Sequence, residues 1–162
     1  MEEIIKVGMA DMKMCAAPDK LTTLGLGSCV GIALYDPVTK ISGMIHIMLP
    51  DSTRIKNNTN IAKFADTGIA AMYEMMIRKG ALAARIIAKI AGGAKMFSYG
   101  AGNSDLMNVG DRNVEATKEA LRKLNIRIVA EDTGLNYGRT IVFDSLNGDL
   151  LIKAVGKPEK VI

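Results

Sequence analysis

A β-hairpin is the feature of this sequence that most constrains its fold. Val30–Tyr35 and Ile41–Leu49 are apolar segments rich in β-branched residues, and the turn sequence Asp36-Pro-Val-Thr-Lys40 separates them. Two such segments joined by a short Pro-containing turn are typical of paired antiparallel strands. The sequence therefore predicts a hairpin over residues 30–49.

The remaining segments predict further strands and two helices. Apolar residues at helical spacing favour a helix over 61–79, between Asn60 as its cap and Gly80 as its end. A second helix is expected over 113–124, capped by Asp111 or Asn113. Extended segments are expected at 2–9 with a continuation over 10–15, and at 84–91, 126–130, 140–143 and 150–155. This pattern predicts an α/β (α+β) fold, a layered sandwich with mixed β-sheets, as a single domain over residues 1–162.

Composition and charge narrow the class of protein. The net charge of +4 comes from scattered basic residues rather than a dense run with aromatics, which argues against nucleic-acid binding. No apolar run approaches the ~20 residues of a membrane span, and no leader is recognisable, so we expect a cytoplasmic protein without membrane insertion. Two cysteines do not make a disulfide framework, and Cys15 is interpreted as structural.

A cysteine precedes the predicted hairpin, and the only histidine lies within it. Cys29 ends the glycine-rich stretch Thr23-Leu-Gly-Leu-Gly-Ser-Cys29, and His46 lies in the second strand. If the turn centres between Pro37 and Val38, Cys29 lies directly opposite His46, with Cβ atoms ~4.5–5.5 Å apart. A displaced turn would instead pair Val30 with His46.

This pair has the chemistry of a thiol nucleophile and its base. An adjacent imidazole can take the thiol proton, so we expect the pKa of Cys29 to lie below that of a free thiol. Gly25 and Gly27 allow a tight bend whose N–H groups could receive an oxyanion. Two simpler interpretations stay open: a lone Cys is often a small core residue, and a His among isoleucines is often a hydrogen-bonded interior residue.

Other kinds of site are disfavoured. The stretch Gly25-Leu-Gly27 lacks the third glycine and the following helix of a dinucleotide site. Ser28 is not in a Gly-x-Ser-x-Gly motif. One His and two distant Cys make a zinc site improbable, so no metal is expected.

Six short motifs follow one another between residues 23 and 134, within a resemblance that covers about residues 5–155. They are Thr23-Leu-Gly-Leu-Gly-Ser-Cys29, His46-Ile-Met-Leu-Pro-Asp-Ser52, Lys63-Phe-Ala-Asp-Thr67, Ala88-Lys-Ile-Ala-Gly-Gly-Ala94, Gly110-Asp-Arg-Asn-Val-Glu-Ala116 and Ala130-Glu-Asp-Thr-Gly134. Together they resemble the CheD family of chemoreceptor glutamine deamidases. One departure is Leu135, where a second glycine is usual after Gly134.

The resemblance implies a cysteine hydrolase of the protein-glutamine glutaminase type, without a cofactor, in a sandwich fold related to a deamidating bacterial toxin. It implies that Cys29 is the nucleophile, His46 the base and Thr23 the third, polar member of the site. Gly27 and Ser28 are candidates for substrate or oxyanion binding. Gly92-Gly93 and the 97–105 loop are candidates for lining the groove.

The resemblance also implies partners and leaves alternatives. The substrates would be methyl-accepting chemotaxis receptors, and the phosphatase CheC would be a binding partner that the protein stimulates. A receptor methylesterase is one alternative, because a thiolate also attacks an ester. A purely regulatory CheC-binding module is the other.

Overall fold

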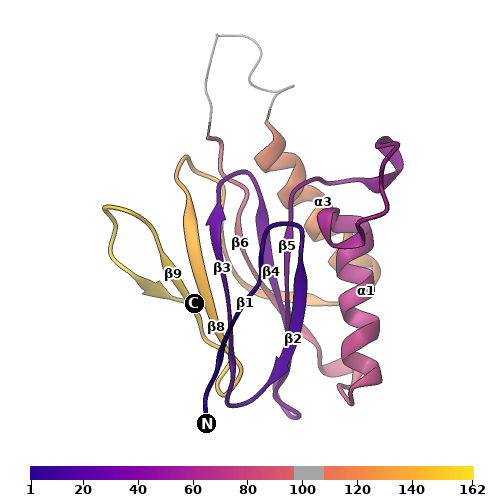
Figure 1. The fold of residues 1–162 in the computed structure, drawn as a ribbon, viewed down its shortest axis with the longest axis vertical. Helices are drawn as coiled ribbons and strands as arrows, with labels where there is room; N and C mark the ends of the chain where they lie inside the picture. Colours follow the sequence, from indigo (N-terminus) through magenta and orange to yellow (C-terminus); the bar gives the residue numbers. More distant parts are fainter. Residues whose placement is uncertain (97–107) are drawn as a thin grey trace.

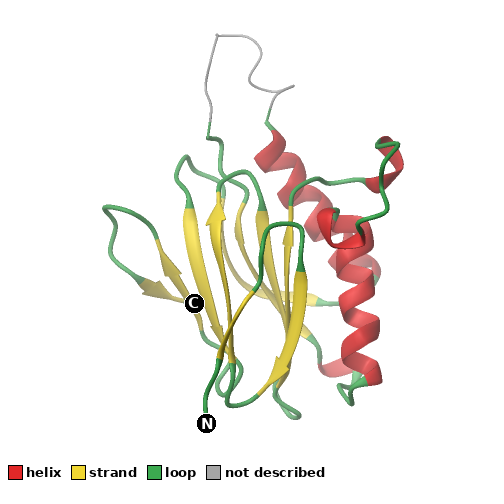
Figure 2. Ribbon diagram, in the orientation of Figure 1, coloured by secondary structure: helices red, strands yellow, loops and turns green. Residues whose placement is uncertain are grey.

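The computed structural model describes residues 1–96 and 108–162, which form two stacked five-stranded sheets and two α-helices (Figure 1). Both helices lie on the outer side of one sheet, whereas the other sheet carries none on the described residues (Figure 2). This arrangement confirms the expected α+β layered sandwich with mixed sheets.

The first sheet has the strand order β1-β3-β8-β9-β10. Its short edge strand β1 pairs parallel with β3, and the remaining pairs are antiparallel. The ladder between β3 and β8 shifts register between Thr23 and Leu26, at the glycine-rich stretch. The strands are β1 (Ile4–Lys6), β3 (Lys20–Leu26), β8 (Arg139–Asp144), β9 (Leu150–Lys153) and β10 (Lys160–Val161).

The second sheet has the strand order β2-β5-β4-β6-β7 and contains the predicted hairpin as β4 and β5. Every residue of the central strand β4 is buried, because the first sheet covers one face and the helices cover the other. The strands are β2 (Met12–Ala16), β5 (Ile41–Ile47), β4 (Val30–Asp36), β6 (Ile87–Gly92) and β7 (Arg127–Thr133).

The N-terminal segment crosses between the sheets. Residues 10–15 were expected to continue the first strand, but that expectation is wrong, because β1 and β2 belong to different sheets. The chain turns at Ala10, which has a positive φ of 55°, and β2 then pairs antiparallel with β5. The chain therefore crosses from the first sheet to the second at this point.

Both helices differ from their expected limits. The segment 61–79 forms a 3₁₀ turn over Ile61–Lys63, which Asn60 caps, and then the helix α1 (Ala65–Arg78). Phe64 separates the two because its backbone is extended. Two further 3₁₀ turns span Ser52–Arg54 and Ala83–Arg85.

The second helix, α3 (Val109–Lys123), begins four residues before the expected position. Its cap is Asn108, whose side chain accepts a hydrogen bond from the backbone N–H of Asp111. Neither Asp111 nor Asn113 is therefore the cap. Asn113 instead lies inside the helix and is fully buried.

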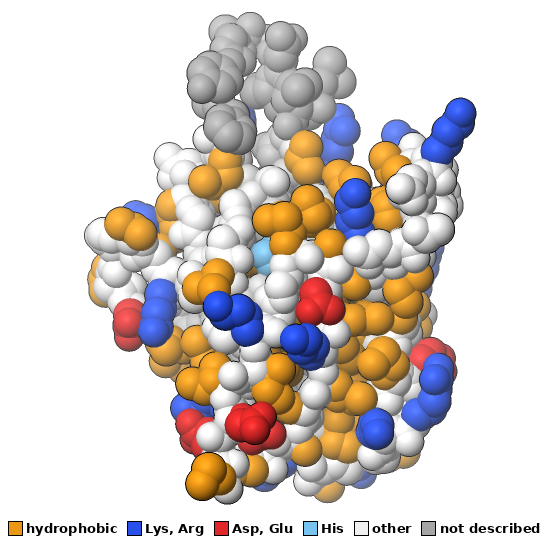
Figure 3. Space-filling view, in the orientation of Figure 1, with side chains coloured by type: hydrophobic (Ala, Val, Ile, Leu, Met, Phe, Trp, Pro, Cys, Tyr) orange, Lys and Arg blue, Asp and Glu red, His pale blue; other side chains and the backbone are white. Residues whose placement is uncertain are grey.

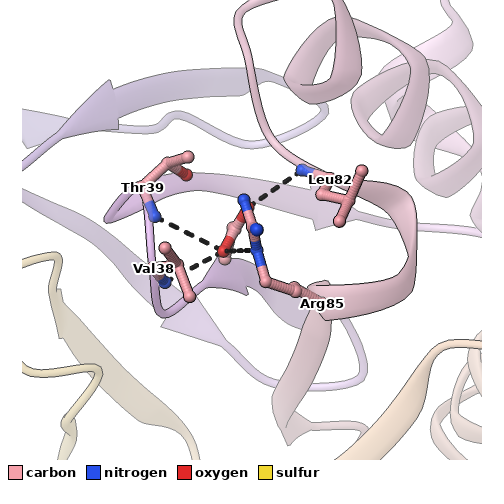
Figure 4. A network of polar contacts seen from close by, with 5 residues as sticks. Val38, Thr39, Leu82 and Arg85 are labelled. Atoms are coloured by element: carbon pink, nitrogen blue, oxygen red, sulfur yellow. Dashed lines mark hydrogen bonds and ion pairs between the residues drawn. The ribbon is translucent and has the colours of Figure 1, made fainter.

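The turn end of the hairpin is fixed by a buried carboxylate (Figure 4). Asp36 accepts from the backbone N–H groups of Val38 and Leu82, each at 2.9 Å, and from Thr39 at 3.4 Å. The Arg85 guanidinium donates to both carboxylate oxygens at 3.0 Å. Burial would raise the pKa of Asp36, but the hydrogen bonds from Arg85 and the backbone outweigh it and hold that pKa well below its usual range.

This carboxylate explains the register of the hairpin. Asp36 pairs with Ile41, so the loop consists of the four residues between them, and Lys40 closes it with a positive φ of 58°. The turn therefore centres one residue later than expected.

Candidate active site

Because the turn centres one residue later than expected, the residue opposite His46 is not the expected one. The structure places Gly31 opposite His46, not Cys29 and not Val30, so the expected direct pairing is wrong. The ladder ends at Val30 and Ile47, and Cys29 is the residue just before β4. Because the displacement from the expected register is two residues, Cys29 and His46 still share one face as diagonal neighbours.

The structure brings His46 and Thr23 together. Thr23 lies on β3 of the first sheet and His46 on β5 of the second, and Thr23 Oγ1 is 2.7 Å from His46 Nδ1. The same hydroxyl donates to the Val7 carbonyl at 2.6 Å. A hydroxyl has one proton, so Thr23 must accept at His46, and Nδ1 must be the donor.

This direction fixes the tautomer of the imidazole. With the proton on Nδ1, the neutral His46 ring presents an unprotonated Nε2. That Nε2 is buried and has no hydrogen-bond partner among residues 1–96 and 108–162. Burial lowers the pKa of His46, so the ring is neutral at neutral pH. Figure 3 shows the only histidine as a small pale blue area, almost covered by its neighbours.

The Cys29 thiol is also nearly covered, with 8% of the residue exposed. Burial raises the pKa of Cys29, although a hydrogen bond from its own backbone N–H opposes the shift. The expectation of a lowered thiol pKa is therefore wrong for this resting site. The site holds a neutral thiol and, on the same face, a neutral imidazole whose Nε2 has no partner among the described residues.

Three consecutive carbonyls beside the thiol accept hydrogen bonds from separate donors. Ala94 N–H donates to Gly27 O at 2.8 Å, and Gly93 N–H donates to Cys29 O at 2.8 Å. The side chain of Asn113 donates to Ser28 O at 2.9 Å. These bonds fix the orientation of the peptide groups that lead into the nucleophile candidate.

The N–H groups of the same stretch are unequal. Gly27 N–H donates to Gly25 O at 3.1 Å, so this donor is already occupied. In the described part of the chain, the Ser28 N–H has no backbone acceptor. The Cys29 N–H has none either and donates to the sulfur of its own side chain. Ser28 therefore keeps its candidate role through its backbone.

Gly92 and Gly93 support the site from the neighbouring strand β6. A Cβ on Gly92 would lie 2.3 Å from Cys29 O, and the residue has a positive φ of 108°, so both space and conformation favour glycine there. The two glycines thus pack against the backbone of the Cys29 turn. The 97–105 loop, the other candidate for lining the groove, lies outside the described residues.

Sequence reasoning missed two contributors to this site. Val7 contributes only its carbonyl, which no side-chain pattern reveals. Asn113 was assigned to a helix cap, but its spacing from Thr117 and Leu121 places all three on one buried helical face. That spacing was the available signal for an inward-facing amide.

The described residues contain neither a metal-ligand cluster nor a helix that could span a membrane. No group of three or more His, Cys, Asp or Glu side chains among residues 1–96 and 108–162 is placed to hold a metal ion. No helix in those ranges is long and apolar enough to cross a membrane.

Comparison with known proteins gives consistent matches. The family model of CheD, described as chemotactic sensory transduction, matches residues 48–154. A "Probable chemoreceptor glutamine deamidase CheD" of Lachnoclostridium phytofermentans is 63% identical over 100% of both chains. A relative of the same name from Caldanaerobacter subterraneus subsp. tengcongensis is 59% identical over 99% of this chain and 98% of its own.

Among solved structures, the hypothetical protein YfiH of Bacillus licheniformis matches with a TM-score of 0.50 at 19% identity. The match covers 78% of this chain and 51% of that protein, so this chain spans about half of its length. At this identity the likeness concerns the fold alone.

Proposed function

Because the chain belongs to the CheD family of chemotaxis proteins, we propose that it deamidates glutamine side chains of methyl-accepting chemoreceptors. The relatives that match over nearly the whole chain carry that activity in their names. The observation that supports the proposal best is the fixed tautomer of His46, whose free Nε2 lies on the same face as Cys29. A base for the thiol is thus available without rearrangement of the ring.

In the proposed reaction, Cys29 Sγ attacks the side-chain amide carbon of glutamine while His46 Nε2 takes the thiol proton. Both partners are neutral at the start of this step, because burial disfavours the thiolate and the imidazolium. Thr23 Oγ1 accepts from Nδ1 throughout and stabilises the imidazolium that forms. The thiol and the imidazole come within hydrogen-bonding distance as substrate binds.

The attacked carbonyl becomes an oxyanion that needs hydrogen-bond donors. We assign this role to the Ser28 N–H, which has no acceptor among the described residues, and to the Cys29 N–H, which its own sulfur releases when that sulfur attacks the amide. Collapse of the intermediate breaks the C–N bond, and His46 gives its proton to the departing ammonia. Water then loses a proton to His46 and attacks the thioester. The C–S bond breaks, glutamate is released, and His46 returns the proton to the Cys29 sulfur.

Mass spectrometry of a purified cytoplasmic receptor fragment tests the proposal. Incubation with the wild type should convert glutamine to glutamate at specific receptor positions, and Cys29→Ala should abolish the conversion. Cys15→Ser is the matched control, because Cys15 is the other cysteine and its sulfur forms hydrogen bonds only with Ser42 and Ser145 among the described residues. Unchanged deamidation by Cys29→Ala would refute the assignment of the nucleophile.

The same spectra separate the methylesterase alternative. Ester hydrolysis removes a methylene from methylated glutamate, whereas deamidation exchanges an amide for a carboxyl group. Both products therefore have distinct masses on the same peptide. Demethylation without deamidation would replace the proposed activity with an esterase.

A further inference from the structure

Asn113 connects α3 to the two strand ends that carry the site. Its Nδ2 donates one proton to Ser28 O and the other to Met48 O, each at 2.9 Å. Only the amide nitrogen can donate to two carbonyls, so the orientation of the amide is determined. The remaining Oδ1 is buried and has no partner among the described residues.

The contact with Ser28 O controls a donor of the site. The Ser28 carbonyl and the Cys29 N–H belong to one planar trans peptide group and point in opposite directions. A hydrogen bond that holds the carbonyl toward α3 therefore directs the Cys29 N–H away from the helix. Building on the proposed function, we propose that Asn113 is a positioning residue that aims the Cys29 N–H at the developing oxyanion.

The second contact of Asn113 replaces a backbone ladder that has ended. β4 and β5 stop pairing at Val30 and Ile47, and the N–H groups of Met48 and Leu49 turn away to Lys63 O. The Asn113 amide bridges the separated strands just beyond that point. One side chain thus ties the peptide before Cys29 to the chain segment two residues after His46.

The approach of α3 to this point depends on Gly110. A Cβ there would lie 2.4 Å from Ala94 O and 2.6 Å from Gly93 O, so a larger residue would push the helix outward. The first turn of α3 therefore packs on the same Gly93 and Ala94 whose N–H groups hold Cys29 O and Gly27 O. Helix position and peptide orientation are coupled at this contact.

A purely structural role would give Asn113 the same two hydrogen bonds, so the test needs a readout that only positioning affects. Deamidation develops an oxyanion, whereas alkylation of a thiol by iodoacetamide does not. The variants are Asn113→Ala and, to refill the space, Asn113→Leu. Thr117→Val is the control, because Thr117 is buried one turn further along the same helix face and its hydroxyl has no partner among the described residues.

All variants are made in a Cys15→Ser background, so that only Cys29 alkylates. We expect both Asn113 variants to lower kcat for the receptor fragment by up to about 10²-fold, since removing one oxyanion donor costs 10²–10³-fold. The rate of iodoacetamide alkylation and its pH profile should stay within about twofold of the wild type. Thr117→Val should leave kcat and alkylation unchanged.

The ¹H–¹⁵N spectrum of the labelled protein supplies an arm that needs no receptor. The Cys29 amide signal should shift in both Asn113 variants and stay fixed in Thr117→Val. An unmoved Cys29 amide, an unchanged kcat, or a parallel loss of kcat and alkylation would each overturn the proposal. If the wild type leaves every receptor glutamine intact while the Cys29 amide still shifts, the proposed function fails and the orienting contact stands.

Discussion

Buried polar groups have hydrogen-bond partners at the turn end of the β4–β5 hairpin, whereas at the open end two of them lack partners among the described residues. At the turn end, both oxygens of the Asp36 carboxylate accept hydrogen bonds, three of which come from the Arg85 guanidinium. At the open end, His46 Nε2 and Asn113 Oδ1 are equally buried but have no partners in the described ranges. Buried polar groups are normally paired, so the unpaired acceptors mark the end where a ligand is expected. The turn end of the hairpin thus contributes to stability, whereas the open end carries the candidate active site.

The strongest test of this contrast removes the free acceptor. His46→Gln should lower kcat for receptor deamidation by about 10²–10⁴-fold, the usual contribution of a positioned general base. The melting temperature should fall little, because Nε2 makes no hydrogen bond to a described residue. Ammonia release and thermal unfolding measured on the same sample check both parts. A variant that melts early but keeps full activity would reverse the comparison.

A substitution at the turn end should do the opposite. Asp36→Ala removes the acceptor of Arg85 and of the turn N–H groups, which we expect to cost roughly 2–3 kcal/mol and about 5–10 °C in melting temperature. Activity per folded molecule should remain, since Asp36 lies at the other end of the strands. Thr39→Ala is the matched control, because the Thr39 contact uses only its backbone. Lost activity at a temperature where the variant is folded would contradict the separation.

An intermediate effect is expected at Thr23. Thr23→Val keeps the shape of the side chain but removes the acceptor for His46 Nδ1, so the tautomer is no longer fixed. We expect kcat to fall about tenfold, the equivalent of one hydrogen bond of about 1.4 kcal/mol. Thr23→Ser keeps the hydroxyl and should retain the rate. Equal rates for the Val and Ser variants would show that the ring needs no orienting partner.

The smallest effect is in the pH dependence of stability. Burial lowers the pKa of His46 below its ordinary 6.5, so the unfolded chain binds a proton first and stability falls as pH drops below about 6.5. The lowered pKa of Asp36 also makes folding stability fall as pH drops. This fall begins only near the pKa of an unfolded aspartate, about 3.9. Urea unfolding across this range should show two windows, of which His46→Gln removes the upper and Asp36→Asn the lower.

The sequence was sufficient for the hairpin and for the shared face of Cys29 and His46. Strand periodicity determines which residues share a face, and the register error of two residues preserved it. The exact partner was not predictable, because the turn is set by Asp36 through Arg85, which lies 49 residues further along the chain. Local turn propensity contains no information about that contact.

Two of the other errors have a similar cause. The crossover at Ala10 depends on which sheet has a free edge for β2, and the helix start at Asn108 depends on a cap outside the predicted span. The orientation of the His46 ring depends on a carbonyl of Val7 in the opposite sheet. The crossover and the ring orientation depend on tertiary contacts that the sequence patterns of the separate segments do not indicate, whereas the Asn108 cap is a local contact with Asp111.

The hydrogen bonds that run from His46 through Thr23 to Val7 also restrict the movement of protons. The series ends on a carbonyl oxygen, which is too weak a base to carry a proton onward. A proton that arrives at Nε2 therefore has no exit behind the ring and leaves only on the side where it entered. The imidazole would hold the thiol proton until it transfers that proton to the ammonia nitrogen. Turnover should therefore be insensitive to the concentration of external buffer.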